Sequence, residues 1–190
     1  MTLVRIPFLP ETPPLPARAA ALVEAAAPRI EAFEFGDERV PAFVASNALV
    51  AHDVLSRLHG EVGGSSFCEW GSGYGTVTGI ASLIGWEATG IEIEPRLVRE
   101  SRALIEAHDI EARIVEGSYY APGIHRDDPD PEALVATLGF APWDFDLVYA
   151  YPWPAEVEML VGQFERFAPP GRWLVISHGG VDLQAYRQEP

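Results

Sequence analysis

The sequence has few basic residues, a single cysteine and no long apolar run. Its 190 residues include 13 Lys and Arg against 28 Asp and Glu, a net charge of -15. Nucleic-acid binding depends on clustered basic residues, so nucleic acid is an unlikely partner. The lone Cys68 excludes an intrachain disulfide. No apolar run reaches the roughly 18 residues that a transmembrane helix needs. We therefore expect a cytoplasmic protein that has no membrane partner.

The composition and the prolines indicate how the chain is organised. Apolar residues make up 48% and charged residues 22%, which is typical of a globular domain. Five prolines within residues 1–16 predict an extended arm, because proline is excluded from element interiors. Helices are expected over residues 17–34, with a break or a new start at Pro28, and over about 47–58. We expect one domain overall, with an N-terminal arm and helices over residues 1–60 and a core over residues 61–190.

Short apolar strands then alternate with helices. The expected strands cover residues 67–70, 88–93, 112–115, 145–150 and 173–177, and the expected helices cover residues 77–84, 95–108, 131–138 and 155–167. This order predicts an α/β fold with a doubly wound, mostly parallel sheet. Ligands of such sheets bind at the carboxyl ends of the strands, so the chemistry is expected there.

A glycine-rich segment follows the first of these strands and precedes a helix. It reads Glu69-Trp-Gly-Ser-Gly-Tyr-Gly75. Gly71 and Gly73 allow a tight turn with positive φ, and their missing side chains let backbone N–H groups approach a ligand. Three alternating glycines between a strand and a helix are a stronger signal than an isolated pair. The segment predicts a ligand-binding loop.

The second strand ends at an acidic residue, Glu92, with Glu94 two residues beyond it. An acid at this point is expected to accept hydrogen bonds from ribose hydroxyls, and Glu94 is the alternative. A nicotinamide-binding loop would have its third glycine at Thr76, whereas the extra glycine here is Gly75. The carboxylate of Glu69 suits a cationic ligand, because S-adenosyl-L-methionine carries an amino group and a sulfonium. The residues therefore favour that cofactor over a nicotinamide.

These motifs resemble those of the class I S-adenosylmethionine-dependent methyltransferases. The match consists of an acid before the glycine loop and an acid that ends the second strand, and the resemblance spans roughly residues 67–177. The resemblance implies a Rossmann-like fold in which Glu69 and the loop hold the methionine part and Glu92 holds the ribose. It implies that Gly117 and Ser118 flank the adenine, although the family often has an acid where Ser118 stands. The expected cofactor contacts are Glu69, Gly71, Ser72, Gly73, Gly75, Glu92, Ile93, Gly117 and Ser118.

The segment Tyr149-Ala-Tyr-Pro-Trp-Pro154 follows the fourth strand, where the resembling enzymes place the methyl acceptor. It is similar to the Asn/Asp-Pro-Pro-Tyr motif of amino-group methyltransferases. Ala150 replaces the polar residue that binds the amine there, so the motif does not support nitrogen methylation. Tyr151 and Trp153 form an aromatic wall for a planar or cationic acceptor, or else pack the loop onto the sheet.

No catalytic residue is identified by the sequence. Tyr151, Trp153 and His178 are the candidates, His178 as a general base, a role that histidine side chains commonly take. No His/Cys cluster has metal-binding spacing, so no metal is expected. Asp144 and Asp146 are expected to be structural.

Few residues follow the fifth strand. The methyltransferase fold normally closes with a sixth strand and an antiparallel seventh, whereas only residues 179–190 remain here. We therefore expect a sheet shortened at its C-terminal edge. Exposed sheet edges are usually covered or paired, so the proline-rich arm or a second subunit is expected to cover this one, which makes a homo-oligomer possible.

The sequence leaves three functions open. The first is a methyltransferase that acts on a small-molecule or protein acceptor. The second is a non-catalytic S-adenosylmethionine-binding module, which the short C-terminal end and Ala150 suggest. The third is a NAD-binding oxidoreductase, which rests only on the general fold.

Overall fold

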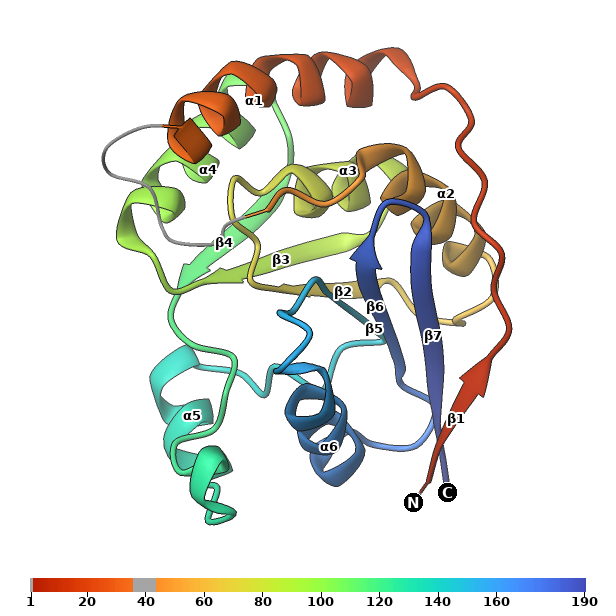
Figure 1. Cartoon of the computed structure of the whole chain (residues 1–190), viewed down its shortest axis with the longest axis vertical. Coiled ribbons are helices and arrows are strands. Elements are labelled where there is room, and N and C mark those ends of the chain that lie inside the picture. The colour runs from red at the N-terminus through yellow and green to blue at the C-terminus, as the bar shows by residue number, and fades with distance from the viewer. Residues whose placement is uncertain (1, 36–43) are drawn as a thin grey trace.

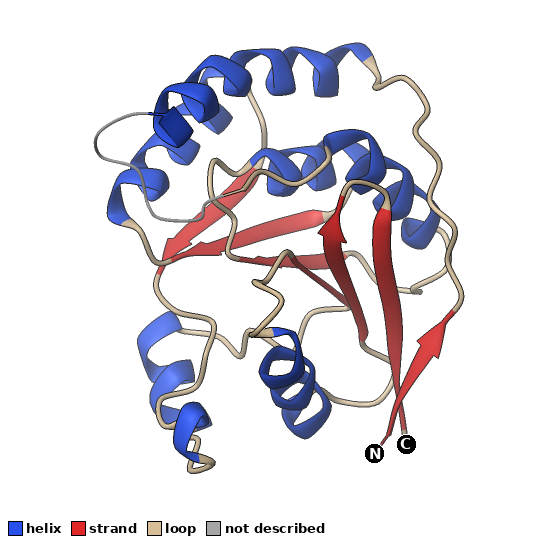
Figure 2. Cartoon of the chain, viewed as in Figure 1, coloured by secondary structure: helices blue, strands red, loops and turns tan. Residues whose placement is uncertain are grey.

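The computed structural model describes residues 2–35 and 44–190. Within them, helices flank a seven-stranded sheet (Figure 1 and Figure 2). The predicted α/β fold with a mostly parallel sheet is therefore confirmed. The elements in chain order are β1 (Thr2–Ile6), α1 (Ala17–Phe35), α2 (Ala48–His59), β2 (Ser66–Trp70), α3 (Thr76–Ile84), β3 (Glu87–Glu92), α4 (Pro95–Ala107), β4 (Ala112–Glu116), the 3-10 helix η1 (Ile124–Arg126), α5 (Pro131–Leu138), β5 (Leu147–Ala150), α6 (Val157–Phe167), β6 (Trp173–Gly179) and β7 (Asp182–Glu189).

The strand order of the sheet is β1-β7-β6-β5-β2-β3-β4. Strands β2 to β6 pair in parallel, and β7 is antiparallel to both of its neighbours. The chain first runs outward from β2 to β3 and β4, and then returns to the other side of β2 to form β5. The strand order thus reverses between β2 and β5, and ligands of open α/β sheets bind at such a reversal.

Each face of the sheet packs against its own layer of helices. In Figure 1, α1 to α4 lie above the sheet and α5 and α6 lie below it. Side chains alternate between the layers, so that Phe67 joins the apolar cluster under α2 and α3, whereas Cys68 and Trp70 join the cluster over α6. A parallel sheet covered on both faces requires apolar residues on both, which explains the near-continuous apolar strands.

The C-terminal edge is longer than the sequence predicted. Strand β7 was not expected, because a helix was assumed to come before any further strand. Instead, Gly179 and Gly180 reverse the chain directly, with φ of 98° and 58°. A hairpin needs only a few connecting residues, so the short C-terminal segment is enough for an antiparallel strand. The expected shortening of the sheet is therefore wrong.

The N-terminal arm, one of the two coverings that the sequence left open, covers this edge, and it does so as a strand. Residues 2–6 of β1 pair with β7 over the register from Thr2↔Glu189 to Ile6↔Ala185. The first proline is Pro7, so the paired segment keeps all its backbone donors. Because β1 runs parallel to β2–β6, the N-terminus supplies the additional strand that the resemblance places after the fifth.

Helix α1 continues through Pro28, so the predicted break at that residue is wrong. The helix loses one backbone hydrogen bond there but keeps its packing, because Leu22 and Ala26 are fully buried in the cluster that α1 shares with α3 and α4. Gly79 on α3 allows α1 to approach α3 closely. A Cβ at Gly79 would lie 2.6 Å from Cδ2 of Leu22. This contact fixes α1 across α3.

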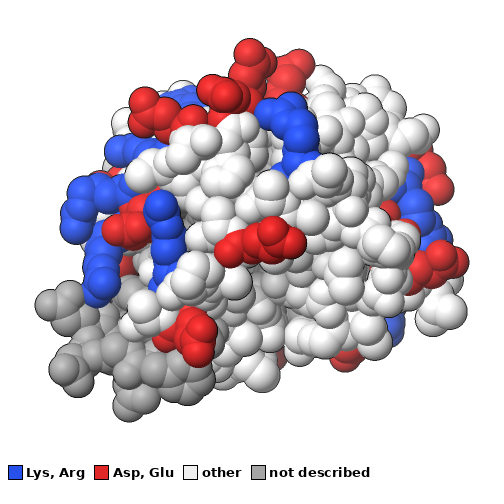
Figure 3. Space-filling view, turned by 90° about the horizontal axis from the view of Figure 1, so that it is seen from above, with Lys and Arg blue, Asp and Glu red and all other residues white. Residues whose placement is uncertain are grey.

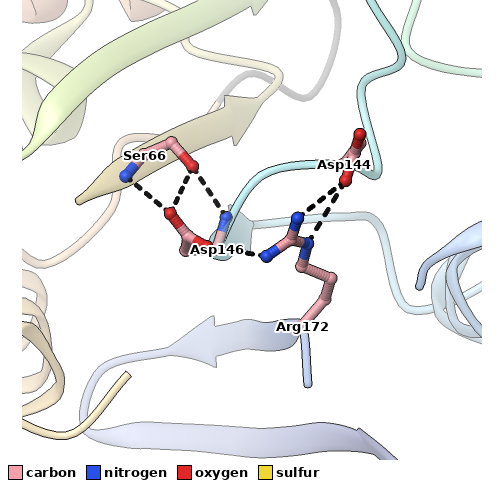
Figure 4. A network of polar contacts seen from close by, with 4 residues as sticks. All are labelled: Ser66, Asp144, Asp146 and Arg172. Atoms are coloured by element: carbon pink, nitrogen blue, oxygen red, sulfur yellow. Dashed lines mark hydrogen bonds and ion pairs between the residues drawn. The ribbon is translucent and has the colours of Figure 1, made fainter. Parts of the chain in front are cut away.

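The predicted structural role of Asp144 and Asp146 is confirmed by a polar network at the amino ends of β2, β5 and β6 (Figure 4). Asp146 accepts hydrogen bonds from the backbone and hydroxyl of Ser66, at 3.0 and 2.6 Å. Arg172 pairs with both aspartates, at 2.7 Å to Asp146 and 2.9 Å to Asp144. Burial by itself would raise the pKa of Asp146, but the Ser66 hydrogen bonds and the Arg172 charge outweigh it and lower that pKa.

Candidate functional site

Residues 71–75 turn the chain from β2 into α3 through backbone conformations that favour glycine. Gly71, Gly73 and Gly75 have φ of 79°, 52° and 71°. The N–H groups of Gly71 and Ser72 both donate to the carbonyl oxygen of Ile91, at 2.9 Å. These bonds fasten the loop to β3. The loop thus lies at the carboxyl ends of two adjacent parallel strands.

The carboxylate of Glu92 braces the same loop from the end of β3. Its Oε2 accepts a hydrogen bond from Gly73 N at 2.8 Å, and its Oε1 accepts one from Glu94 N at 2.8 Å. The residue is only 7% exposed. Each carboxylate oxygen has about two acceptor positions, so both can accept a further bond from a ligand.

Glu69 is the second buried carboxyl group at this point. Its Oε2 accepts hydrogen bonds from the backbone N and the hydroxyl of Thr78, at 2.8 and 2.5 Å. Burial raises the pKa of Glu69 to about 8, the Thr78 bonds oppose this shift, and the Glu92 charge adds to it. The carboxyl group is therefore mainly protonated at neutral pH. A cationic ligand beside it would favour the ionised form.

A cavity of about 720 Å³ adjoins these groups at the carboxyl ends of β2, β3, β5 and β6. That volume lies in the usual range for small-molecule sites, roughly 300–1,000 Å³. Helix α1 roofs the cavity with Val23, Ala26, Ala27 and Ile30. Residues 151–154, which follow β5, and His178, near the end of β6, line another part of the cavity.

Most of the residues expected to bind the cofactor line this cavity. They are Glu69, Gly71, Ser72, Gly73, Glu92 and Ile93. The other three, Gly75, Gly117 and Ser118, do not line it. Gly75 packs behind the loop, where an added Cβ would lie 3.0 Å from Cβ of Ser101 on α4. Gly117 follows β4 and donates its N–H to the carbonyl oxygen of Glu92 at 2.9 Å. The hydroxyl of the next residue, Ser118, accepts a hydrogen bond from Tyr120 N at 3.0 Å.

The three candidate catalytic residues also line the cavity. Tyr151 and Trp153 follow β5, and His178 lies near the end of β6. Trp153 is 45% exposed. The Tyr151 hydroxyl lies against Gly179, where an added Cβ would be 2.7 Å from the phenolic oxygen. Nε2 of His178 is buried and has no hydrogen-bond partner among the described residues.

Sequence reasoning missed the roof of the cavity. Val23, Ala26, Ala27 and Ile30 recur at i, i+3, i+4 and i+7, which marks one face of a helix. That spacing could have indicated a buried face. It does not distinguish a face that packs on the core from one that covers a ligand cavity.

Residues 2–35 and 44–190 hold no group of three His, Cys, Asp or Glu side chains that could bind a metal ion. Over the same residues, no helix is long and apolar enough to cross a membrane.

No family model and no curated protein matches the sequence. Solved structures do match the fold. An O-methyltransferase from Bacillus cereus in complex with S-adenosylhomocysteine has a TM-score of 0.58 at 14% identity, over 86% of this chain and 66% of that chain. An O-methyltransferase from Streptomyces achromogenes that is involved in tomaymycin synthesis, in complex with S-adenosylmethionine, has a TM-score of 0.54 at 12% identity, over 86% and 66%.

An RNA methyltransferase from Salinibacter ruber in complex with S-adenosylhomocysteine has a TM-score of 0.52 at 19% identity, over 76% of this chain and 92% of that chain. The present chain thus spans about two thirds of the length of the two O-methyltransferases. The chain has the Rossmann-like fold of the class I S-adenosylmethionine-dependent methyltransferases.

Proposed function

We propose that the protein is a methyltransferase that binds S-adenosyl-L-methionine in the cavity beneath α1. The main support is that the glycine loop, Glu69 and Glu92 line one cavity at the point where the strand order reverses. Two carboxyl groups at the edge of one cavity suit a ligand that carries a sulfonium and an amino group. The proteins of the same fold that were crystallised with this cofactor or its demethylated product support the proposal.

Several features of the cavity fit this cofactor. The Ser72 hydroxyl is buried and has no hydrogen-bond partner among the described residues, so a polar ligand group would satisfy it. Glu92 keeps free acceptor positions for ribose hydroxyls. Ile93 lines the cavity and is 68% exposed, which is unusual for isoleucine and suits a side chain that an adenine ring covers. Gly117, whose N–H donates to the carbonyl oxygen of Glu92, and Ser118 would flank that ring.

When bound, the cofactor would supply a methyl group activated by the sulfonium. The contribution of the protein would be to hold an acceptor in line with that group and to exclude water. Tyr151 and Trp153 would contact the acceptor. His178, whose Nε2 has no other partner, would take the proton of a hydroxyl acceptor.

The last residue of β5 argues against the amine-binding motif that this part of the chain resembles. Ala150 is fully buried in the cluster above α6, and its side chain carries no polar atom. The acceptor is therefore proposed to be a small molecule or protein side chain that is held by other means than that motif.

Calorimetric titration of variants with S-adenosylhomocysteine tests the site. Gly73→Val should abolish binding because it blocks the backbone approach. Gly162→Val, at an open glycine on α6, is the control for the substitution. Glu92→Ala should weaken binding by about tenfold or more, in line with the loss of charge-assisted hydrogen bonds, whereas Glu94→Ala should not.

If both Gly73→Val and Glu92→Ala keep wild-type affinity, the assignment is wrong. Methyl transfer from labelled cofactor into a metabolite extract then distinguishes an active enzyme from a binding module without catalysis.

A further inference from the structure

Four acidic residues line the cavity. They are Glu31 on α1, Glu69 at the end of β2, whose carboxyl group is mainly protonated at neutral pH, Glu92 at the end of β3, and Glu94, which caps α4. No arginine from residues 2–35 or 44–190 lines the cavity, and the chain contains no lysine. An anionic molecule entering this space would lose its hydration and find no cationic partner among these residues, which is costly.

Several arginines of the described chain pair with acidic residues that do not line the cavity. Arg29 of α1 pairs with Glu100 at 3.2 Å, and Arg57 pairs with Asp53 at 3.3 Å. Figure 3, which views the molecule from above, shows a largely uncharged central surface, with acidic residues on it and along its upper rim and basic residues mainly on the left. The acidic residues of the lining disfavour anions, while Arg29 and Arg96 act on the lining residue Tyr74 from outside the lining.

Apolar side chains that are exposed to solvent also collect at the cavity. The large apolar residues that are exposed among those described are Val4, Leu9, Val44, Ile93, Trp153 and Val181, and Val44, Ile93 and Trp153 line the cavity. Exposed apolar side chains that gather around a concave site commonly mark where a ligand is bound. If the cofactor covers Ile93, then Val44 and Trp153 are left for a second molecule.

Aromatic and proline side chains form the wall next to Trp153. Tyr151, Pro152 and Pro154 all line the cavity, and the prolines restrict the backbone of this wall. A flat ring can stack on Trp153, and a cation can lie over it. His178, on the neighbouring strand β6, offers a buried Nε2 that has no partner among the described residues.

We propose that the part of the cavity bounded by Val44, Tyr151, Trp153 and His178 is an acceptor subsite for a small aromatic hydroxy compound that carries no negative charge. The inference rests on the proposed function, because it assigns the other end of the cavity to the cofactor. The subsite selects uncharged or cationic molecules and rejects phosphorylated and carboxylated ones. Its selectivity comes from Glu31 and Glu94, the acidic lining residues that are not assigned to the cofactor, and its affinity comes from the aromatic wall.

Three probes that share a phenol ring separate these contributions. They are tyrosol, which is uncharged, tyramine, which is cationic, and 4-hydroxyphenylacetate, which is anionic. Each is titrated by calorimetry into the protein saturated with S-adenosylhomocysteine. Tyrosol and tyramine should bind about tenfold or more tightly than 4-hydroxyphenylacetate. Trp153→Ala should weaken the binding of tyrosol severalfold, whereas Leu9→Ala, at an exposed apolar residue outside the cavity, should not.

Charge reversal on α1 provides the matched test of selectivity. Glu31→Arg, inside the cavity lining, should strengthen the binding of 4-hydroxyphenylacetate and weaken that of tyramine. Glu24→Arg is the control, because it changes the net charge equally at an exposed position of the same helix that does not line the cavity. It should alter the affinity for neither 4-hydroxyphenylacetate nor tyramine. The affinity for S-adenosylhomocysteine should be unchanged in Trp153→Ala.

The results distinguish this inference from the proposed function. If S-adenosylhomocysteine itself fails to bind, the proposed function is wrong. If it binds but 4-hydroxyphenylacetate binds as tightly as tyramine, the acceptor subsite is wrong while the cofactor site stands. Absence of binding by all three probes at millimolar concentration would also overturn the subsite.

Discussion

Replacing Glu69 by glutamine should change how the stability of the protein depends on pH. Burial raises the pKa of Glu69 from 4.5 to about 8 in the folded protein. Glutamine has the same shape and keeps a carbonyl oxygen that can accept both Thr78 hydrogen bonds, but it does not titrate. Comparing the two proteins therefore isolates the ionisation of this one group.

The sign follows from the direction of the pKa shift. Between the ordinary and the raised pKa, the folded state binds more protons than the unfolded state, so the free energy of unfolding falls as pH rises. At about 1.4 kcal/mol per pKa unit, the loss approaches 5 kcal/mol by pH 8. This is comparable to the whole stability of a small domain, about 5–15 kcal/mol. Below about pH 4.5 the carboxyl group is protonated in both states and the effect is absent.

Urea unfolding of the wild type and Glu69→Gln at about pH 5, 6.5 and 8 measures this effect. The stability of the variant relative to the wild type should increase by several kcal/mol from the lowest to the highest pH, on the scale of the linkage relation. Other titrating groups, such as Asp146, are shared by both proteins and cancel. A stability difference that stays constant over this pH range would refute a raised pKa at Glu69.

Three further predictions concern the cofactor, the roof and the strand ends. Binding of S-adenosylmethionine at neutral pH should release close to one proton, seen as a dependence of the calorimetric enthalpy on the buffer; equal release by Glu69→Gln would contradict this. Leu22→Ala should lower the free energy of unfolding by about 2–5 kcal/mol because it leaves a cavity between α1 and α3, whereas Leu9→Ala should cost little. Asp146→Asn should destabilise the protein at neutral pH by weakening the Ser66 and Arg172 contacts. Because the pKa of Asp146 is lowered, this difference should shrink as pH falls through that pKa, and urea unfolding that shows no such convergence would argue against the network.

The sequence predicted the lining of the cavity best where the signal is local. Gly71 and Gly73 are needed where the backbone has positive φ, and Glu92 stands where a strand ends. Both requirements can be recognised from neighbouring residues in the sequence. Gly75 has the same backbone conformation, but it serves packing against Ser101. A glycine in a loop therefore does not by itself indicate contact with a ligand, because the need for space can come from either side of the loop.

The features that the sequence did not predict depend on long-range pairing. Strand β7 exists because β6 and β1 lie on either side of it, and β1 comes from the other end of the chain. The roof over the cavity is formed by a helical face whose spacing is also that of an ordinary core. The sequence also failed to predict that α1 continues through Pro28, since packing on α3 and α4 outweighs this local helix-breaking residue.

Titration of the wild-type protein with S-adenosylmethionine, S-adenosylhomocysteine and NAD tests the central claim most directly. Calorimetry should show one binding site for S-adenosylmethionine and one for S-adenosylhomocysteine. The Gly73→Val variant should no longer bind S-adenosylmethionine. NAD should not bind, because the third glycine of a nicotinamide loop is Thr76 here. Binding of NAD in the absence of any binding of S-adenosylmethionine would contradict the proposed function.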